Sequence, residues 1–242
     1  MKLFRRNAAG SVSAPSSAVF FFVLLILLTS CEPPGKPESN SEEAAQVADF
    51  KTLFGQNCAG CHGENGKNGA VRPLNDPLYL AIIPKQELRK VIENGRAGTP
   101  MPAWARSRGG PLDPQQITAL VDGIEQTWAR PVDVRDAPAY IAGARRGDSD
   151  AGKKLFSMNC FMCHGPGAPI GPVTEPAFLS LTTDQGLRAS IIAGRPDFGM
   201  PNYQHLKLGR GLSDQNITDL VAYLSSLRPA SAISEGGERG GR

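Results

Sequence analysis

Apolar side chains recur at helical spacing in two segments that lie about 100 residues apart. Gaps of one, three and four positions place them on one face of an α-helix. The two stripes consist of Ile117, Leu120, Val121, Ile124 and Trp128 and of Ile217, Leu220, Val221, Leu224 and Leu227. Asp113, followed by Pro114, and Ser213 can cap the first turns. The pattern predicts a helix at the end of each of two repeated units.

Other landmarks return in the same order, 99 to 102 residues apart. They are Leu53-Phe54 and Leu155-Phe156, Leu88-Arg89 and Leu187-Arg188, Gly95-Arg96 and Gly194-Arg195, and Met101-Pro102 and Met200-Pro201. Helices are expected over 47–57 and 149–159, and again over 85–93 and 184–193. Self-similarity at a fixed period indicates duplicated structural units. The sequence therefore predicts two homologous helical domains, residues 47–128 and 149–228.

The segment between the two domains, residues 129–148, contains Pro131, Pro138 and two glycines and is expected to be a linker. The last residues, 229–242, are rich in glycine and charge and predict a disordered tail.

The strongest chemical signal is the motif Cys-x-x-Cys-His, which occurs once in each repeat. The two thiols of such a motif attach a haem covalently, and the histidine binds its iron. The copies are Cys58-Ala59-Gly60-Cys61-His62 and Cys160-Phe161-Met162-Cys163-His164. A thioredoxin-like redox pair would need a β-rich pattern, and a zinc site would leave the repeated Met-Pro unexplained. We therefore expect two covalently bound haems c.

Each repeat resembles a class I cytochrome c domain, with an N-terminal helix, the haem motif, a loop, a middle helix, a distal methionine and a final helix that crosses the first. The resemblance covers roughly residues 47–128 and 149–228. It implies an all-α fold of two tandem domains, each made of a few short helices around a covalent haem. In that family a methionine sulfur is the second axial iron ligand, and Met101 and Met200 stand where it is expected.

The resemblance also implies support for the proximal histidines, since the family uses a proline carbonyl to accept the Nδ1–H of that ring. Pro172 lies where this residue is expected for His164, and Pro73 is the nearest equivalent for His62.

The first repeat departs from the family where the two terminal helices should pack together. The second repeat has Phe156 and Tyr223 there, whereas the first has Phe54 but Gly123 opposite Tyr223. We expect either a closer backbone approach or looser packing in the first domain.

The N-terminus has the pattern of an export signal. A basic start precedes an apolar run of 10 residues, 19–28, which is shorter than the roughly 20 residues of a membrane-spanning helix. The run ends in Leu28-Thr29-Ser30-Cys31, which resembles the lipobox of bacterial lipoproteins. This predicts a signal peptide over 1–30, lipidation at Cys31 and a flexible tether over 31–46, so that lipid anchors the protein to the periplasmic face of a bacterial membrane. The alternatives are an ordinary secretory signal and a short anchor with an incidental cysteine.

Cysteine count and charge narrow the chemistry further. The five cysteines are the two motif pairs and Cys31, so none remains for a disulfide or an axial thiolate. The net charge of +3 derives from Lys2, Arg5 and Arg6, without which basic and acidic residues balance. Nucleic-acid binding has no support.

With the haem's own four nitrogens, histidine and methionine would fill all six coordination positions of each iron. This favours electron transfer over catalysis. The expected partners are redox proteins such as a membrane-bound respiratory complex, with the chain acting as a carrier or as a subunit. A dihaem peroxidase is the alternative, and it would need one open or displaceable iron position. A thiosulfate dehydrogenase would need a cysteine ligand that the cysteine count does not provide. His205 is interpreted as a polar loop residue, with an alternative ligand or proton-coupled group as the competing hypothesis.

Overall fold

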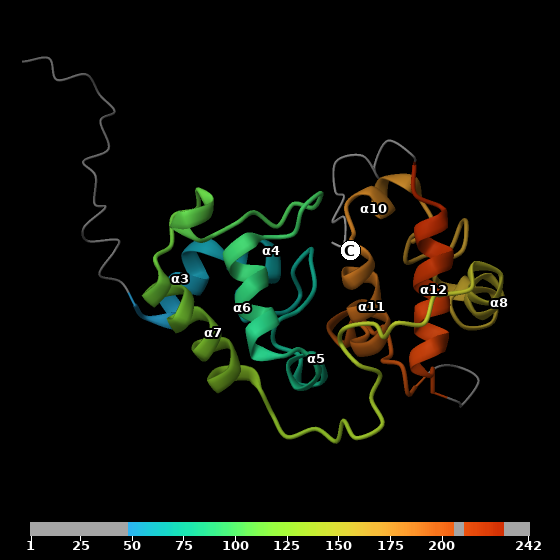
Figure 1. The fold of residues 1–242 in the computed structure, drawn as a ribbon, viewed down its shortest axis with the longest axis horizontal. Coiled ribbons are helices and arrows are strands. Elements are labelled where there is room, and N and C mark those ends of the chain that lie inside the picture. The colour runs from blue at the N-terminus through green and yellow to red at the C-terminus, as the bar shows by residue number, and fades with distance from the viewer. Residues whose placement is uncertain (1–47, 206–210, 230–242) are drawn as a thin grey trace, which may run out of the picture. The chain divides into compact units, whose positions relative to one another are not determined.

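The computed structural model describes residues 48–205 and 211–229, and these form two helical domains (Figure 1). The described residues contain no strand and only two isolated β-bridges, Ala105 with Leu112 and Arg195 with Met200. The first domain comprises α3 Phe50–Asn57, α4 Ala59–His62, α5 Pro77–Ile82, α6 Lys85–Asn94, the 3-10 turn η1 Arg106–Arg108 and α7 Pro114–Trp128. The second comprises α8 Ser149–Asn159, α9 Phe161–His164, α10 Pro176–Ser180, α11 Asp184–Ala193, η2 Pro196–Phe198 and α12 Asp214–Ser226. The predicted all-α fold is confirmed.

Local sequence signals account for where the long helices begin. Asp113 and Ser213 each form a capping box at the start of α7 and α12, as their side-chain oxygens accept otherwise unpaired first-turn N–H groups. The helix expected from residue 47 begins instead at Phe50, where the Asp49 carboxylate accepts Thr52 N–H at 2.8 Å. Helix α5 was not predicted, although Asp76-Pro77 is the same start signal as Asp113-Pro114.

In the first domain, α3 and α7 pack together through aromatic side chains and one glycine. The Phe50 ring lies 5.4 Å from the Trp128 ring and 5.7 Å from the Phe54 ring. A Cβ atom at Gly123 would lie only 2.2 Å from Cγ of Phe50. The crossing is therefore closely packed, because Phe50 fills the space that Gly123 leaves free.

The second domain has the reverse arrangement between α8 and α12. Tyr223 packs 5.6 Å from the Phe156 ring, as expected, and here the glycine lies on the first helix. A Cβ atom at Gly152 would lie 2.0 Å from the Asp219 carbonyl oxygen and 2.8 Å from Cβ of Tyr223. Each crossing thus pairs one large residue with one glycine. The large residue lies on the first helix in the first domain and on the last helix in the second domain.

The segment between the domains is bound to both. The Tyr140 side chain is buried in the first domain's core, 6.3 Å from the Tyr79 ring. Its backbone carbonyl accepts from Gln185 Nε2 of α11 at 2.8 Å, and Arg188 of α11 donates to Ala139 O. Residues 129–148, the predicted linker, carry no helix, and their middle is a packed part of the structure.

Each hydrophobic core also includes residues from a helix of the other domain. Leu78 of α5 belongs to the second cluster, and Ala189 and Ala193 of α11 belong to the first. Direct packing of α5 on α11 therefore joins the two domains.

No helix in the described part of the chain is long and apolar enough to cross a membrane. The predicted signal peptide, Cys31, the tether and all but the first residue of the predicted tail lie outside the described residues.

Candidate haem sites

Each Cys-x-x-Cys-His motif forms one short helical turn set at the end of a longer helix. Cys58 ends α3 and begins α4, with φ −119° and ψ −34°, and Cys160 does the same between α8 and α9 with φ −116° and ψ −31°. The His62 N–H donates to Cys58 O at 3.0 Å, and the His164 N–H donates to Cys160 O at 2.8 Å. The turn therefore brings two thiols and one imidazole together in the same way in both domains.

Both motif histidines have one ring nitrogen occupied by a backbone carbonyl. Nδ1 of His62 lies 2.7 Å from Arg72 O, and Nδ1 of His164 lies 3.3 Å from Gly171 O. A carbonyl only accepts, so Nδ1 carries the proton and Nε2 is left to bind a metal. Burial lowers the pKa of His62, which favours the neutral imidazole that ligation requires.

The carbonyls that face the histidines differ from those expected. Pro73 and Pro172 were predicted to supply them, but the acceptors are Arg72 and Gly171, each one residue earlier. Pro73 and Pro172 directly follow these acceptors in the sequence. Gly171 has φ +91°, a backbone that residues with a side chain rarely adopt.

The four motif cysteines are unpaired. Burial raises the pKa of Cys58 to about 12 and that of Cys160 to about 11, with a smaller contribution from the neighbouring motif cysteine in each case. Before haem attachment both residues are thus protonated thiols, and thiols react with disulfides and oxidants far more slowly than thiolates.

The segments that carry the predicted distal methionines are built alike in both domains. The Arg96 N–H donates to Met101 O at 3.0 Å, and the Arg195 N–H donates to Met200 O at 3.1 Å. The glycine that ends each middle helix lies against the Met-Pro backbone: a Cβ atom at Gly95 would lie 2.6 Å from Met101 O, and one at Gly194 would lie 2.6 Å from Met200 O. The repeated Gly-Arg and Met-Pro landmarks are therefore parts of one contact.

Both glycines also require a backbone that other residues rarely adopt. Gly95 has φ +67° and Gly194 has φ +72°, in the left-handed region where a side chain is strained. The close approach and the positive φ together explain why glycine stands at these positions.

The donor set fits a covalently attached haem. Each domain offers two free thiols beside a histidine whose Nε2 is available. Large apolar side chains of the second domain are exposed: Phe161 (49%), Met162 (69%), Ile170 (60%) and Phe198 (59%). Nη1 of Arg72 is buried without a hydrogen-bond partner in the described structure, and a haem carries carboxylates that could satisfy it. The described residues contain no cluster of three or more histidine, cysteine or acidic side chains placed to hold a lone metal ion.

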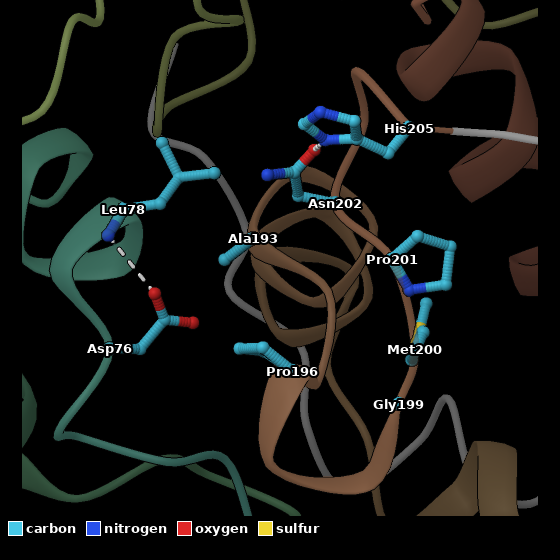
Figure 2. Close-up of a pocket in the computed structure, with 9 residues that line it drawn as sticks. All are labelled: Asp76, Leu78, Ala193, Pro196, Gly199, Met200, Pro201, Asn202 and His205. Atoms are coloured by element: carbon cyan, nitrogen blue, oxygen red, sulfur yellow. Dashed lines mark hydrogen bonds between the residues drawn. The ribbon is translucent and has the colours of Figure 1, made fainter. Parts of the chain in front are cut away.

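His205 lies on the wall of a cavity of about 310 Å³ that Met200, Asn202 and Asp76 also line (Figure 2). Its side chain is exposed, and its Nδ1 lies 2.9 Å from Asn202 Oδ1. This contact inside its own loop matches the interpretation of His205 as a polar loop residue.

Two helical domains, each presenting this thiol and histidine arrangement with a fixed Met-Pro segment, define a c-type cytochrome with two haem sites. Comparison with protein families gives the same class. Residues 45–122 match the family described as cytochrome C oxidase, cbb3-type, subunit III, and residues 149–228 match the cytochrome c family. The chain therefore contains two cytochrome c domains and is a dihaem cytochrome c.

Several curated proteins are similar to this chain over both domains. The cbb3-type cytochrome c oxidase subunit FixP of Bradyrhizobium sp. (strain ORS 278) is 28% identical over 73% of this chain and 59% of that protein. FixP of Bradyrhizobium diazoefficiens is 30% identical over 73% of this chain and 59% of that protein. The cbb3-type subunit CcoP of Rubrivivax gelatinosus is 27% identical over 81% of this chain and 60% of that protein. The dihaem region is homologous to these subunits, and this chain spans about three fifths of their length.

A solved chain of the Kuenenia stuttgartiensis reducing HAO-like protein complex matches 74% of this chain and 96% of its own length, with a TM-score of 0.42 and 20% identity. This likeness is too distant to bear on function.

Proposed function

We propose that the chain transfers electrons through two covalently bound haems with histidine and methionine axial ligands. The observation that carries the proposal is the duplicated geometry: each domain pairs a histidine whose Nδ1 is held by a carbonyl with a methionine segment fixed against a helix-ending glycine. Two sites built alike are expected to perform the same chemistry twice.

The residues of each site have separate roles. Cys58 and Cys61, and likewise Cys160 and Cys163, hold the macrocycle through thioether bonds. His62 and His164 would each hold the iron through Nε2, while the Nδ1 hydrogen bond fixes the ring and makes it a better donor.

Met101 and Met200 would each hold the iron through the thioether sulfur. The bound haem supplies an iron that alternates between the ferric and ferrous states. A thioether sulfur favours ferrous iron and raises the reduction potential relative to a second histidine. With both axial positions filled, no site is left for oxygen or peroxide, and electrons pass without bond making or breaking.

The proposed partner is a cbb3-type oxidase, because the relatives are named as subunits of that complex and residues 45–122 match its subunit III family. The chain would act as the cytochrome subunit of such a complex or as a carrier beside it. Lipid at Cys31 would hold it at the periplasmic face of the membrane, where tethering raises its effective concentration near a membrane complex. A single acyl chain binds only marginally, whereas a bacterial lipoprotein cysteine carries more than one.

An optical spectrum of the purified oxidised protein tests the ligation. Methionine on ferric haem gives a weak long-wavelength charge-transfer band, which we expect at two-haem intensity. Met101→Ala and Met200→Ala should each remove about half of it, since the domains are duplicated. Binding of cyanide or carbon monoxide by the unaltered protein would contradict the proposal and favour a peroxidase-like enzyme.

The partner and the anchor need their own measurements. Co-purification of the full chain with oxidase activity from its native membrane supports the subunit, and recovery as a separate protein supports the carrier. Mass spectrometry of the mature N-terminus shows whether Cys31 is acylated.

A further inference from the structure

Two side chains of the second domain form hydrogen bonds with the loop that supports the first domain's proximal histidine. Arg195 Nη2 donates to Gly69 O at 3.0 Å, and Asp197 Oδ2 accepts the Asn68 N–H at 3.0 Å. Arg195 and Asp197 also pair with each other at 2.9 Å, and their side chains are only 18% and 3% exposed. A partly buried ion pair that donates to one backbone group and accepts from its neighbour restrains that backbone.

The segment held in this way is the one that orients His62. A Cβ atom at Gly69 would lie 2.3 Å from Cys61 O and 2.4 Å from the His62 carbonyl carbon, so Gly69 lies directly on the haem motif. Three residues later, Arg72 O accepts the Nδ1–H of His62 at 2.7 Å. Displacement of Gly69 would therefore move both the motif backbone and the hydrogen-bond acceptor of its histidine.

A second contact crosses the interface in the opposite direction. Arg72 Nη2 donates to Gly194 O at 3.3 Å, while its guanidinium lies 5.1 Å from the Tyr79 ring centre. Gly194 is the glycine that lies against Met200, and Arg195 exchanges two backbone hydrogen bonds with Met200, at 3.0 and 3.1 Å. The contacts therefore run from the histidine side of the first haem site to the methionine side of the second.

Within the described residues, the equivalent arginine of the first domain makes a different contact. Arg96 is the equivalent of Arg195 in the repeat, but it donates to Tyr140 Oη at 3.0 Å. The equivalent arginines therefore have different contacts, and only Arg195 of the two donates to the loop after the first haem motif.

We propose that the Arg195–Asp197 pair of the second domain positions the proximal histidine of the first haem, and so couples the first haem site to the methionine segment of the second. The proposal rests on the ligation of haem by His62. Arg195 and Asp197 are positioning residues, because they act through Gly69, Asn68 and Arg72.

The test uses Arg195→Gln and Asp197→Asn in the full dihaem protein. In oxidised c-type haems, the paramagnetic shifts of the haem-methyl protons depend on the orientation of the axial ligands. We expect both variants to change the first haem's methyl pattern in the same sense. Met101→His and Met200→His assign each set of resonances to its haem.

Charge alone predicts something different. The two substitutions remove charges of opposite sign, so a purely electrostatic effect would move the first haem's potential in opposite directions and leave its methyl pattern unaltered. That result, or changes confined to the second haem, would overturn the proposal.

Asp133 and Arg135 provide a matched control, since they also pair two residues apart but are 61% and 87% exposed. Asp133→Asn and Arg135→Gln should leave both haem signatures unchanged. Arg195→Lys keeps the charge without the planar fork, and is expected to alter the first haem's pattern as well. It serves as the second variant if Arg195→Gln fails to fold.

One readout does not depend on haem ligation. Asp197→Ala should speed hydrogen exchange at the Asn68 amide by about tenfold, because a hydrogen bond to a charged acceptor is lost. Unchanged exchange would show that the contact does not hold the loop. Faster exchange in a protein whose spectrum lacks methionine ligation would instead count against the proposed function alone.

Discussion

A Cβ atom added to Gly123 would lie 2.2 Å from Cγ of Phe50. At the equivalent crossing in the second domain, Gly152 lies on the first helix and Tyr223 on the last, in place of Phe50 and Gly123. Both domains thus pack a large residue against a glycine at this crossing, with the two residues exchanged between the helices.

Gly123→Ala is expected to destabilise the first domain by about 1–3 kcal/mol, because overpacking outweighs the better helix propensity of alanine. Guanidinium unfolding followed by circular dichroism measures this. Combining Phe50→Gly with Gly123→Tyr copies the second domain's arrangement, and it should be more stable than the sum of the single effects predicts. Strict additivity would show that the two positions do not share one space.

Gly95→Ala and Gly194→Ala are expected to weaken the methionine ligation that we propose for the first and second haem respectively. The added methyl group would meet the Met-Pro backbone at about 2.6 Å or less, and the positive φ adds strain of about 1 kcal/mol. The long-wavelength band of the oxidised protein measures the loss. Gly98→Ala is the control, since Gly98 has φ +71° but nothing within 4 Å of its Cβ position. If Gly98→Ala weakens the band equally, strain rather than contact is responsible.

Arg188→Met is expected to release the linker from the second domain. The Arg188 side chain is 3% exposed, donates to Ala139 O and Thr218 Oγ1, and pairs with Asp214. Its loss removes these hydrogen bonds from partly exposed acceptors, at a cost of about 1–3 kcal/mol. Limited proteolysis should then cleave within 129–148 faster than in the unaltered protein. Arg135→Met, at an exposed ion pair, should leave the cleavage rate unchanged.

Acid is expected to weaken the contact between the domains. The pKa of Asp197 is lowered from 3.8, chiefly by its hydrogen bonds from Arg195. Its contribution to stability is therefore complete above pH 3.8 and is lost as the pH falls through the lower, folded-state value. Asp197→Asn should make stability less dependent on pH in this range.

The carboxyl of Asp76 is expected to change the stability of the fold with pH in the opposite direction. Burial raises its pKa above 3.8, so its protonation favours the folded state as the pH falls toward that value. Asp76→Asn should therefore steepen the net loss of stability in acid, and unfolding curves between about pH 3 and 6 compare the two variants. Equal slopes in both variants would contradict the assignment.

Much of the local architecture follows from the sequence alone. Helices α8 and α11 have the predicted bounds, and Asp113 and Ser213 cap the helices expected of them. These features depend on residues a few positions apart, so periodicity and capping chemistry predict them. The haem motifs are equally local, since five consecutive residues make each turn.

The helix crossings show where this reasoning becomes incomplete. Gly123 was recognised as unusual, but Phe50, which fills its space, lies more than 70 residues away. The acceptor for His62 was placed one residue late because a carbonyl's direction depends on the fold of the whole loop.

The two Cys-x-x-Cys-His motifs, the duplication and the Met-Pro pairs were determined by the sequence, because covalent attachment and ligation require particular residue types at fixed spacing. The tertiary structure alone decided that Arg195 and Asp197 hold the loop beneath the first haem motif, while the equivalent Arg96 binds Tyr140. Equivalent residues in a repeat have the same local surroundings, and only the packing of one domain on the other gives them different partners.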